Sequence, residues 1–355
     1  MPLFEIVLYF LASLLLLTVI LPLVKKDLWI FRIFDYPRFQ KFIIIGILTV
    51  AWIANFYNSN KWPDHIYTFL LSFSFLHLGY LIVPFTFFGK KMIEKVKWDH
   101  NNPCLNLLVA NIYQKNENYN KVLELVRQKD PDIIFLLETN NQWLDAVKIL
   151  RDDYPYYIEI PKENTYGLLF YSKLPLLHYE INYLIDQEIP SIIADVKFNN
   201  QSVRIYGLHP TPPVPQENLH STDRDAEILL VGRMAKKHEG PCIVLGDLND
   251  VAWSYTTKLF LKTSGLLDPR RGRGFFSTFH AKHFLLRWPL DHYFVSSHFR
   301  LIGMKVEKHI NSDHFPISIC LVIHSEDDKN KMEPDGKDKK MASEKIEAGL
   351  TDQPM

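Results

Sequence analysis

The sequence has few cysteines and no net charge. It carries three cysteines, Cys104, Cys242 and Cys320, and its 40 Lys and Arg residues balance 40 Asp and Glu residues. An odd, scattered set of cysteines without metal-ligand spacing argues against a disulfide framework and favours packing in a core. A neutral chain has no overall attraction for nucleic acid, so any attraction for phosphate must be local.

The first ninety residues lack long polar stretches. Three apolar runs, at about 3–24, 42–57 and 66–88, are predicted as transmembrane helices. A signal peptide is the alternative for the first run, but it needs a basic start and a small-residue cleavage site, and neither is evident. Residues 1–98 are therefore expected to form a membrane region with three transmembrane helices.

Basic residues flank these runs unevenly. The connection between the second and third runs holds only Lys61. The other two flanks, which three crossings place on one side, hold Lys25, Lys26, Arg32, Arg38 and Lys41, and then Lys90, Lys91, Lys95 and Lys97. Because cytoplasmic flanks are enriched in Lys and Arg, the pattern predicts that everything after the third run is cytoplasmic.

From about residue 99 short apolar runs alternate with polar turns. The predicted strands are Leu105–Ala110, Ile133–Leu137, Gly167–Tyr171, Ser191–Phe198, Val203–Leu208, Ile243–Leu245, Tyr293–Ser296 and Phe315–Ile323. The predicted helices are Tyr119–Gln128, Gln142–Arg151, Arg224–His238 and Ser254–Thr263. This order indicates two packed sheets flanked by helices over residues 99–325. Residues 326–355 are charged and without apolar periodicity, so we expect a disordered tail.

Polar residues stand at the ends or starts of the apolar strands. They are Asn111, Glu138, His209, Asp247, Asn249, Asp291, Asp313 and His314. Each alone is more often a turn former or a satisfied polar group. In an antiparallel sheet the ends of some strands and the starts of others share an edge, so together these residues predict one cluster. Its carboxylate oxygens suit Mg²⁺ or Mn²⁺.

The motifs that hold these residues resemble a known family. LLVANI, LLETNNQW, GLHPTPP, GDLND, LDHYFVS and SDHFPI, in this order over residues 104–323, look like the deoxyribonuclease-like endonuclease/exonuclease/phosphatase superfamily. The three apolar runs before such a domain resemble its bacterial membrane-anchored branch. The resemblance implies a four-layer α/β/β/α sandwich of two mostly antiparallel sheets. It also implies an integral protein of the bacterial inner membrane.

The resemblance implies roles for the metal-binding group. Glu138 corresponds to the principal ligand of Mg²⁺ or Mn²⁺, and Asn111 and Asp313 correspond to residues beside the metal. The AP endonucleases of this superfamily carry an acidic residue where this chain has Tyr113, which disfavours DNA repair.

The remaining motif residues correspond to catalytic groups. Asp247 and Asn249 match the pair that positions the attacking water and a phosphate oxygen. His314 matches a phosphate-contacting residue that Asp291 orients, and His209 matches the residue that protonates the leaving oxygen.

These residues predict a phosphoesterase that cleaves a phosphodiester or phosphomonoester by metal-assisted attack of water. The arginines Arg270, Arg271 and Arg273 are candidate substrate-binding residues, with a solvated basic loop as the alternative. A lipid head group, nucleic acid or a small phosphorylated molecule could be the substrate, and the bilayer is the other expected partner. No protein partner is evident. A nuclease and a catalytically silent membrane scaffold are the competing functions.

Overall fold

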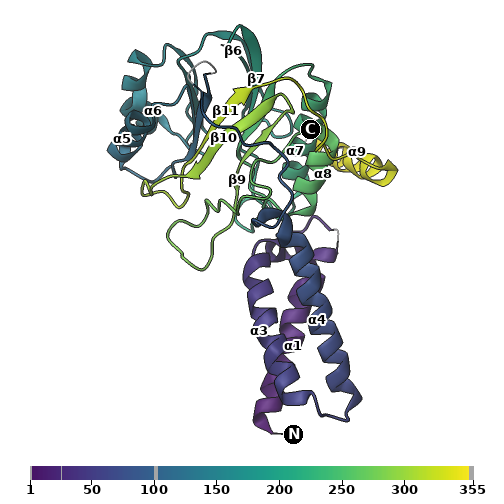
Figure 1. Ribbon diagram of the computed structural model, residues 1–355. Helices are drawn as coiled ribbons and strands as arrows, with labels where there is room; N and C mark the ends of the chain where they lie inside the picture. The colour runs from purple at the N-terminus through teal and green to yellow at the C-terminus, as the bar shows by residue number, and fades with distance from the viewer. Residues whose placement is uncertain (1, 25, 100–102, 352–355) are drawn as a thin grey trace.

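The computed structural model describes residues 2–24, 26–99 and 103–351. A stalk of long helices projects from a larger body of sheets and helices (Figure 1). The stalk consists of α1 (Leu3–Ile20), η1 (Leu21–Leu23), α3 (Arg38–Phe56), α4 (Trp62–Ile82) and η3 (Val83–Phe85). The three apolar helices expected from the sequence are therefore present, and each is long and apolar enough to cross a membrane.

The stalk helices are apolar on their outer faces as well as where they touch. Ala12, Ile45 and Trp52 are fully buried between them, whereas Phe10 and Ile47 are 66% and 67% exposed. A helix that is apolar all round is buried in a large core or in a membrane. No other described residues cover the outer faces of these helices, so the stalk presents an apolar surface.

The body contains two sheets packed face to face. The six-stranded sheet has the order β10-β11-β1-β2-β4-β3, and the five-stranded sheet has the order β5-β6-β7-β8-β9. The strands of the first are β1 (Leu105–Asn111), β2 (Ile133–Leu137), β3 (Tyr156–Ile160), β4 (Leu168–Ser172), β10 (Phe299–Val306) and β11 (Ile317–Ile323). Those of the second are β5 (Leu176–Asn182), β6 (Ser191–Phe198), β7 (Gln201–Leu208), β8 (Cys242–Asp247) and β9 (Asp291–Val295).

Helices cover the outer face of each sheet, as Figure 1 shows. The helices α5 (Tyr119–Lys129) and α6 (Asn141–Val147), with η4 (Lys148–Asp152), lie on the first sheet. The helices α7 (Thr222–Lys237) and α8 (Tyr255–Ser264) lie on the second, and α9 (Gly336–Thr351) packs against these two helices. Within β1, Leu107 faces the other sheet and Leu108 faces the helices, so both faces of the strand are buried. The four-layer α/β/β/α sandwich is confirmed.

The strand directions bring the sequence-predicted polar residues to one edge. β1 and β2 run parallel, as do β7 and β8, whereas β9 and β11 run antiparallel to their neighbours. In the β8–β9 pair Asp247 lies directly opposite Asp291. The ends of β1, β2, β7 and β8 therefore meet the starts of β9 and β11.

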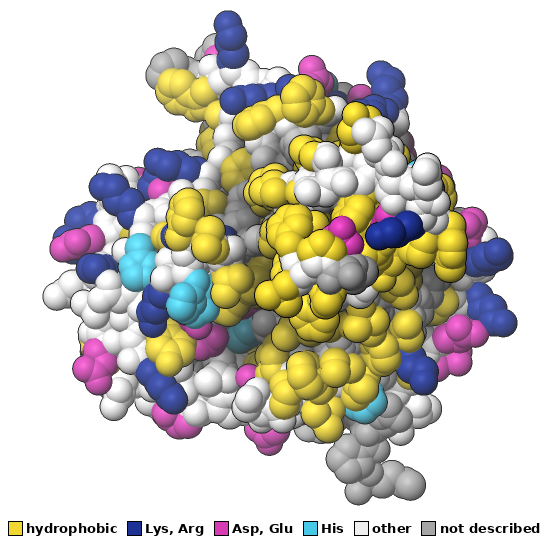
Figure 2. Space-filling model, turned by 90° about the horizontal axis from the view of Figure 1, so that it is seen from below, with side chains coloured by type: hydrophobic (Ala, Val, Ile, Leu, Met, Phe, Trp, Pro, Cys, Tyr) yellow, Lys and Arg dark blue, Asp and Glu magenta, His cyan; other side chains and the backbone are white. Residues whose placement is uncertain are grey.

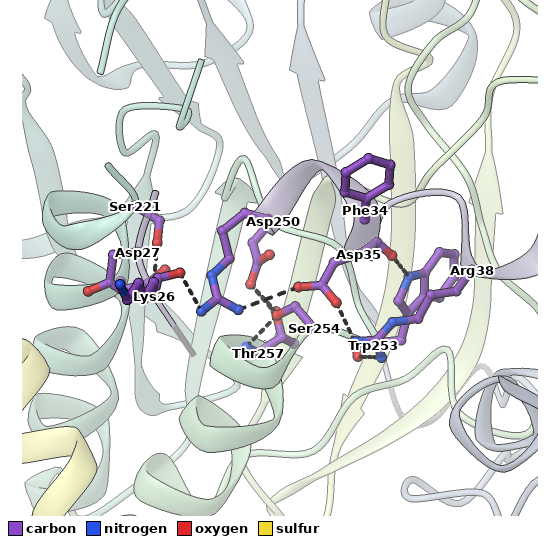
Figure 3. A network of polar contacts seen from close by, with 12 residues as sticks. Lys26, Asp27, Phe34, Asp35, Arg38, Ser221, Asp250, Trp253, Ser254 and Thr257 are labelled. Carbon is purple, nitrogen blue, oxygen red and sulfur yellow. Dashed lines mark hydrogen bonds and ion pairs between the residues drawn. The ribbon is translucent and has the colours of Figure 1, made fainter. Parts of the chain in front are cut away.

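A segment that we name the connector, residues 26–37, joins the first stalk helix to the second and includes α2 (Trp29–Arg32) and η2 (Ile33–Asp35). It is fixed to the body by polar contacts (Figure 3). The Trp253 indole donates to the Asp35 carbonyl at 2.8 Å, and the amide of Ser221 donates to the Asp27 carbonyl at 2.7 Å. The stalk is thus attached to the body through a segment with a defined structure.

The basic residues between the first and second apolar helices have a structural function that the sequence did not indicate. Three of its members are buried at the connector, namely Arg32, Arg38 and Lys41. Arg38 pairs with Asp35 and donates to the Trp253 carbonyl at 2.5 Å. Lys25, counted in the same flank, lies outside the described residues.

The disordered tail predicted for residues 326–355 is corrected by the structure as far as Thr351. Residues 336–351 form α9, whose Ile346 is buried against the second sheet's helices. Lys345 pairs with Asp27 of the connector at 2.6 Å and with Asp225 of α7 at 2.9 Å. Apolar residues are few in this helix and most of its positions are charged or polar, which is why its sequence resembled a disordered segment. We propose that the catalytic domain continues to Thr351 instead of ending at residue 325.

The expectation that all cysteines pack as free thiols is also corrected. Cys104 and Cys320 form a disulfide between β11 and the chain just before β1. Their strands are antiparallel neighbours, so residues 216 positions apart lie side by side. Cys242 is free and buried, as expected.

The docking of α9 can be tested at Gly349. A Cβ atom at this position would lie 2.3 Å from Cβ of Ala226, so Gly349→Leu should push the helix off α7. Overpacking of this kind costs about 1–3 kcal/mol. We expect a lower melting temperature and faster tryptic cleavage after Lys340. The control is Glu347→Leu, which adds the same side chain at an exposed position of the helix. Equal cleavage of both variants would show that α9 is not docked in solution.

Candidate active site

A cavity of about 900 Å³ lies where the two sheets, the connector and the loop between α8 and β9 meet. Six of the residues predicted from the sequence line it, namely Glu138, His209, Asp247, Asn249, Asp313 and His314. Viewed from the stalk end, the surface is hollowed beside the stalk, and acidic and histidine side chains are visible there (Figure 2).

A single amide links the carboxylates of the two sheets. Asn111, at the end of β1, donates from Nδ2 to Glu138 Oε1 at 2.7 Å and to Asp247 Oδ2 at 3.0 Å. Glu138 adopts a left-handed backbone conformation with φ of 60°, which is uncommon for a residue other than glycine. Such strain persists where the surroundings enforce it, and it is concentrated at functional sites. Ser312, missed in the sequence, fixes Asn111 by donating to its carbonyl at 2.8 Å.

His314 is oriented by Asp291. Its Nδ1 lies 2.8 Å from Asp291 Oδ2, and its Nε2 lies 3.5 Å from Asp247 Oδ2. Burial alone would lower the pKa of His314, but the attraction of Asp291 and Asp247 raises it to about 10. The imidazole is therefore protonated at neutral pH and carries a positive charge into the cavity. Thr278, also missed, accepts a hydrogen bond from the Asp291 amide at 3.2 Å.

His209 is in a different electrostatic state. Its Nε2 lies 3.9 Å from Asp247 Oδ2, while its Nδ1 is buried and has no hydrogen-bond partner among the described residues. Burial lowers the pKa of His209 to about 4, so the ring is neutral at pH 7. The Tyr166 ring, with its centroid 5.3 Å away, packs beside it and also lines the cavity. The two histidines of this site are thus differentiated before any ligand binds.

Asn249 is held in place by the connector and by α7. Its amide N–H donates to Asp247 Oδ1 at 3.0 Å, and its φ is 49°. Its carbonyl accepts hydrogen bonds from the Tyr36 hydroxyl at 2.8 Å and from Arg224 Nη1 at 2.7 Å. Neither Tyr36 nor Arg224 was indicated by the sequence, because nothing in the motifs shows that the connector and α7 reach the candidate site.

The buried carboxylates fit a divalent cation. Asp247, Asp291 and His314 offer ligand atoms within 4.8 Å of one another, and Asn111 joins Glu138 to the same group. Burial raises the pKa of Glu138 to about 7, although the hydrogen bond from Asn111 opposes this shift. A nearby cation would stabilise the ionised form of such a carboxylate. Since Asp291 is engaged with His314, Glu138 and Asp247 are the best placed to hold the ion, and oxygen ligands suit Mg²⁺ or Mn²⁺.

The predicted substrate-binding arginines are placed elsewhere, and none of the three lines the cavity. Arg270 is fully buried and pairs with Asp268 at 2.9 Å. Arg271 lies over the Phe85 ring, and Arg273 donates to the Ile93 carbonyl at 2.5 Å. Arg271 and Arg273 contact the segment that leads from the stalk into the body, and Arg270 pairs within the body. Their role in substrate binding stays a prediction.

The fold and the site together define a phosphoester-hydrolase architecture. The model of the endonuclease/exonuclease/phosphatase family matches residues 106–314, and the chain belongs to this family. Members are generally divalent-metal-dependent hydrolases that act on phosphoesters.

Solved structures share this fold at low sequence identity. D. rerio TDP2 complexed with single-strand DNA product is 16% identical, with a TM-score of 0.53 over 61% of this chain and 98% of that chain. An endonuclease/exonuclease/phosphatase from Beutenbergia cavernae DSM 12333 is 14% identical, with a TM-score of 0.51 over 62% and 72% of the two chains. A comparison with curated proteins gave no match.

Metal binding can be tested through stability. A ligand that binds only the folded state at 100 times its Kd stabilises that state by about 2.7 kcal/mol. Saturating Mn²⁺ should therefore raise the melting temperature of the full-length protein in detergent. Glu138→Gln, which keeps the shape of the side chain, should abolish most of the increase. The matched control is Glu163→Gln, which alters an exposed carboxylate bonded to Asn141. An equal Mn²⁺ response in wild type and Glu138→Gln would exclude Glu138 as a ligand.

Proposed function

We propose that this protein is a membrane-anchored, Mg²⁺- or Mn²⁺-dependent hydrolase of phosphodiesters or phosphomonoesters. The observation that carries the proposal is the arrangement around Asn111. Its amide joins the half-buried Glu138 to the buried Asp247, beside a protonated His314 and a neutral His209 in one cavity. Charge of both signs is thus pre-organised where a phosphoester could lie.

The residues divide the chemistry among them. A bound divalent ion would neutralise phosphate charge and lower the pKa of its water from about 15.7 toward about 7 in the best cases. Asp247 and Asn249 are positioned to orient the attacking water. His314, held by Asp291, offers positive charge to the phosphoryl oxygens. His209 is the proposed proton donor to the leaving oxygen. Burial has lowered the pKa of its ring, but a bound anionic substrate would raise that pKa again and so favour the protonated form.

The two competing functions are less well supported. A nuclease is suggested by the neighbour with single-strand DNA product, but the described residues that line the cavity include no Lys or Arg. Proteins that bind nucleic acid depend on such cations at the phosphates. A silent scaffold would have no reason to keep two histidines in different protonation states beside the buried Asp247 and Asp291 and the half-buried Glu138.

The proposed division of labour between the histidines can be tested with two diesters. His209→Ala should lose much less activity on a nitrophenyl phosphodiester, whose leaving group needs no proton, than on an alkyl phosphodiester. His314→Ala should lose about 10²- to 10⁴-fold on both. The measurement is kcat on each ester at saturating Mn²⁺. Equal losses for His209→Ala on both esters would refute its assignment as the general acid.

The cytoplasmic orientation predicted from the sequence is part of the proposal. Lys90, Lys91 and Lys95 lie exposed on the body side of the stalk, whereas Lys61 lies at its far end. Cytoplasmic thiols are kept reduced, so in this orientation Cys104 and Cys320 should be thiols in cells and form their disulfide only on oxidation.

The orientation can be tested by combining a fusion with thiol trapping. A fluorescent protein fused after the C-terminus should fluoresce, and an alkaline phosphatase fused there should be inactive. Maleimide added at lysis should label Cys104 and Cys320 in a Cys242→Ser background. An active phosphatase fusion together with unlabelled cysteines would place the body on the opposite, oxidising side.

A further inference from the structure

The cavity has a polar end and an apolar side. The connector contributes Trp29, Ile30, Ile33 and Phe34 to its lining. These residues follow the first stalk helix directly and face the same space as His209 and His314. An enzyme for a small, water-soluble phosphoester has no need of this apolar wall, because such a substrate exposes little hydrocarbon to bury.

The loop between α8 and β9 adds further apolar residues to the cavity and reaches the stalk. Leu286 and Trp288, from the loop between α8 and β9, line it. At the tip of this loop Phe284 and Leu285 are 80% and 73% exposed. The Leu285 carbonyl accepts a hydrogen bond from Gln40, in the first turn of α3, at 2.8 Å. The tip therefore lies at the level where a candidate membrane span begins, and its apolar side chains are placed at the bilayer surface.

The charge of the lining favours a substrate with one phosphate over a nucleic acid, which carries many. Its described residues include no Lys or Arg, but they include Glu138, Asp247 and Asp313. Such a lining repels the successive phosphates of a nucleic acid, while one phosphate could be accommodated beside His314 by a divalent ion held at the carboxylates. A cavity of about 900 Å³ is within the range of sites that hold a compact head group and part of a chain.

We infer that the substrate is a membrane lipid whose head group carries one phosphate, and that the enzyme takes it directly from the bilayer. The phosphate lies at the carboxylate–histidine cluster, and the hydrocarbon next to it lies against Trp29, Ile30 and Ile33 of the connector. The connector is then both the anchor and a wall of the substrate site. This inference rests on the proposed hydrolase function and adds the class of substrate.

The test compares one head group with long and short chains. Full-length protein with Mn²⁺ is given dioleoylphosphatidylglycerol in nanodiscs or dibutyrylphosphatidylglycerol in solution, and kcat/KM is measured for each. Wild type should prefer the long-chain lipid. Ile33→Asn should lower kcat/KM for the long-chain lipid at least about 10-fold more than for the short-chain one, because an isoleucine-sized apolar contact contributes a factor of about 10 to 100. Ile33 is 49% exposed, so a polar replacement is compatible with folding.

The control is Leu219→Asn, at a 49% exposed apolar residue that neighbours the connector and does not line the cavity. It should leave both rates unchanged. Hydrolysis of the short-chain diester without hydrolysis of the nanodisc lipid would overturn the lipid inference and leave the hydrolase proposal standing. Equal losses on both lipids for Ile33→Asn would also overturn it, as would faster cleavage of a single-stranded oligonucleotide. If neither lipid nor a nitrophenyl diester were cleaved, the hydrolase proposal would fail with it.

Discussion

Three carboxylates share one cluster where the two sheets meet, and the site is organised around this constraint: Asp247 and Asp291 are buried, and Glu138 is half-buried. Burial and mutual repulsion both oppose ionisation of such groups. The cluster reduces the cost in three ways: the Asn111 amide lies between two of the acids, protonated His314 neutralises a third, and the remaining charge fits a divalent ion. The family generally requires a divalent metal, and in this chain the uncompensated negative charge of the cluster gives a physical reason for that requirement.

The connector makes the membrane region part of the same arrangement. Tyr36 and Arg224 fix the Asn249 carbonyl, while Asp27, on the other side of the connector, pairs with Lys345 of α9. Arg224 is itself held by Asp225, which also pairs with Lys345. One polar network therefore runs from the C-terminal helix through Asp225 and Arg224 of α7 to the Asn249 loop, and the connector joins it through Asp27 and Tyr36. A displacement of the stalk relative to the body would therefore change the position of Asn249, through its hydrogen bond with Tyr36.

The sequence predicted the central strands well and the edges poorly. The strands it indicated, such as β2 and β8, are buried on both faces and therefore appear as unbroken apolar runs. The three strands it missed, β3, β5 and β10, are all at sheet edges, where exposed positions interrupt the pattern. The cluster was predicted because each member borders a strong strand. Tyr36, Arg224 and α9 were missed because their roles depend on contacts between segments far apart in sequence, which no local pattern encodes.

These long-range contacts change how the chain divides into parts. Sequence composition separates a membrane region, a catalytic domain and a tail, but each boundary is crossed by contacts that support the site. A fragment that began after the stalk would lose Tyr36, which holds Asn249, and the apolar wall formed by Trp29 and Ile33. A fragment that ended at residue 325 would lose Lys345, leaving the fully buried Asp225 with only part of its compensating charge. An uncompensated buried charge is strongly destabilising. The unit that holds the candidate site is therefore the chain from its first helix to α9, with the connector as one side of the cavity.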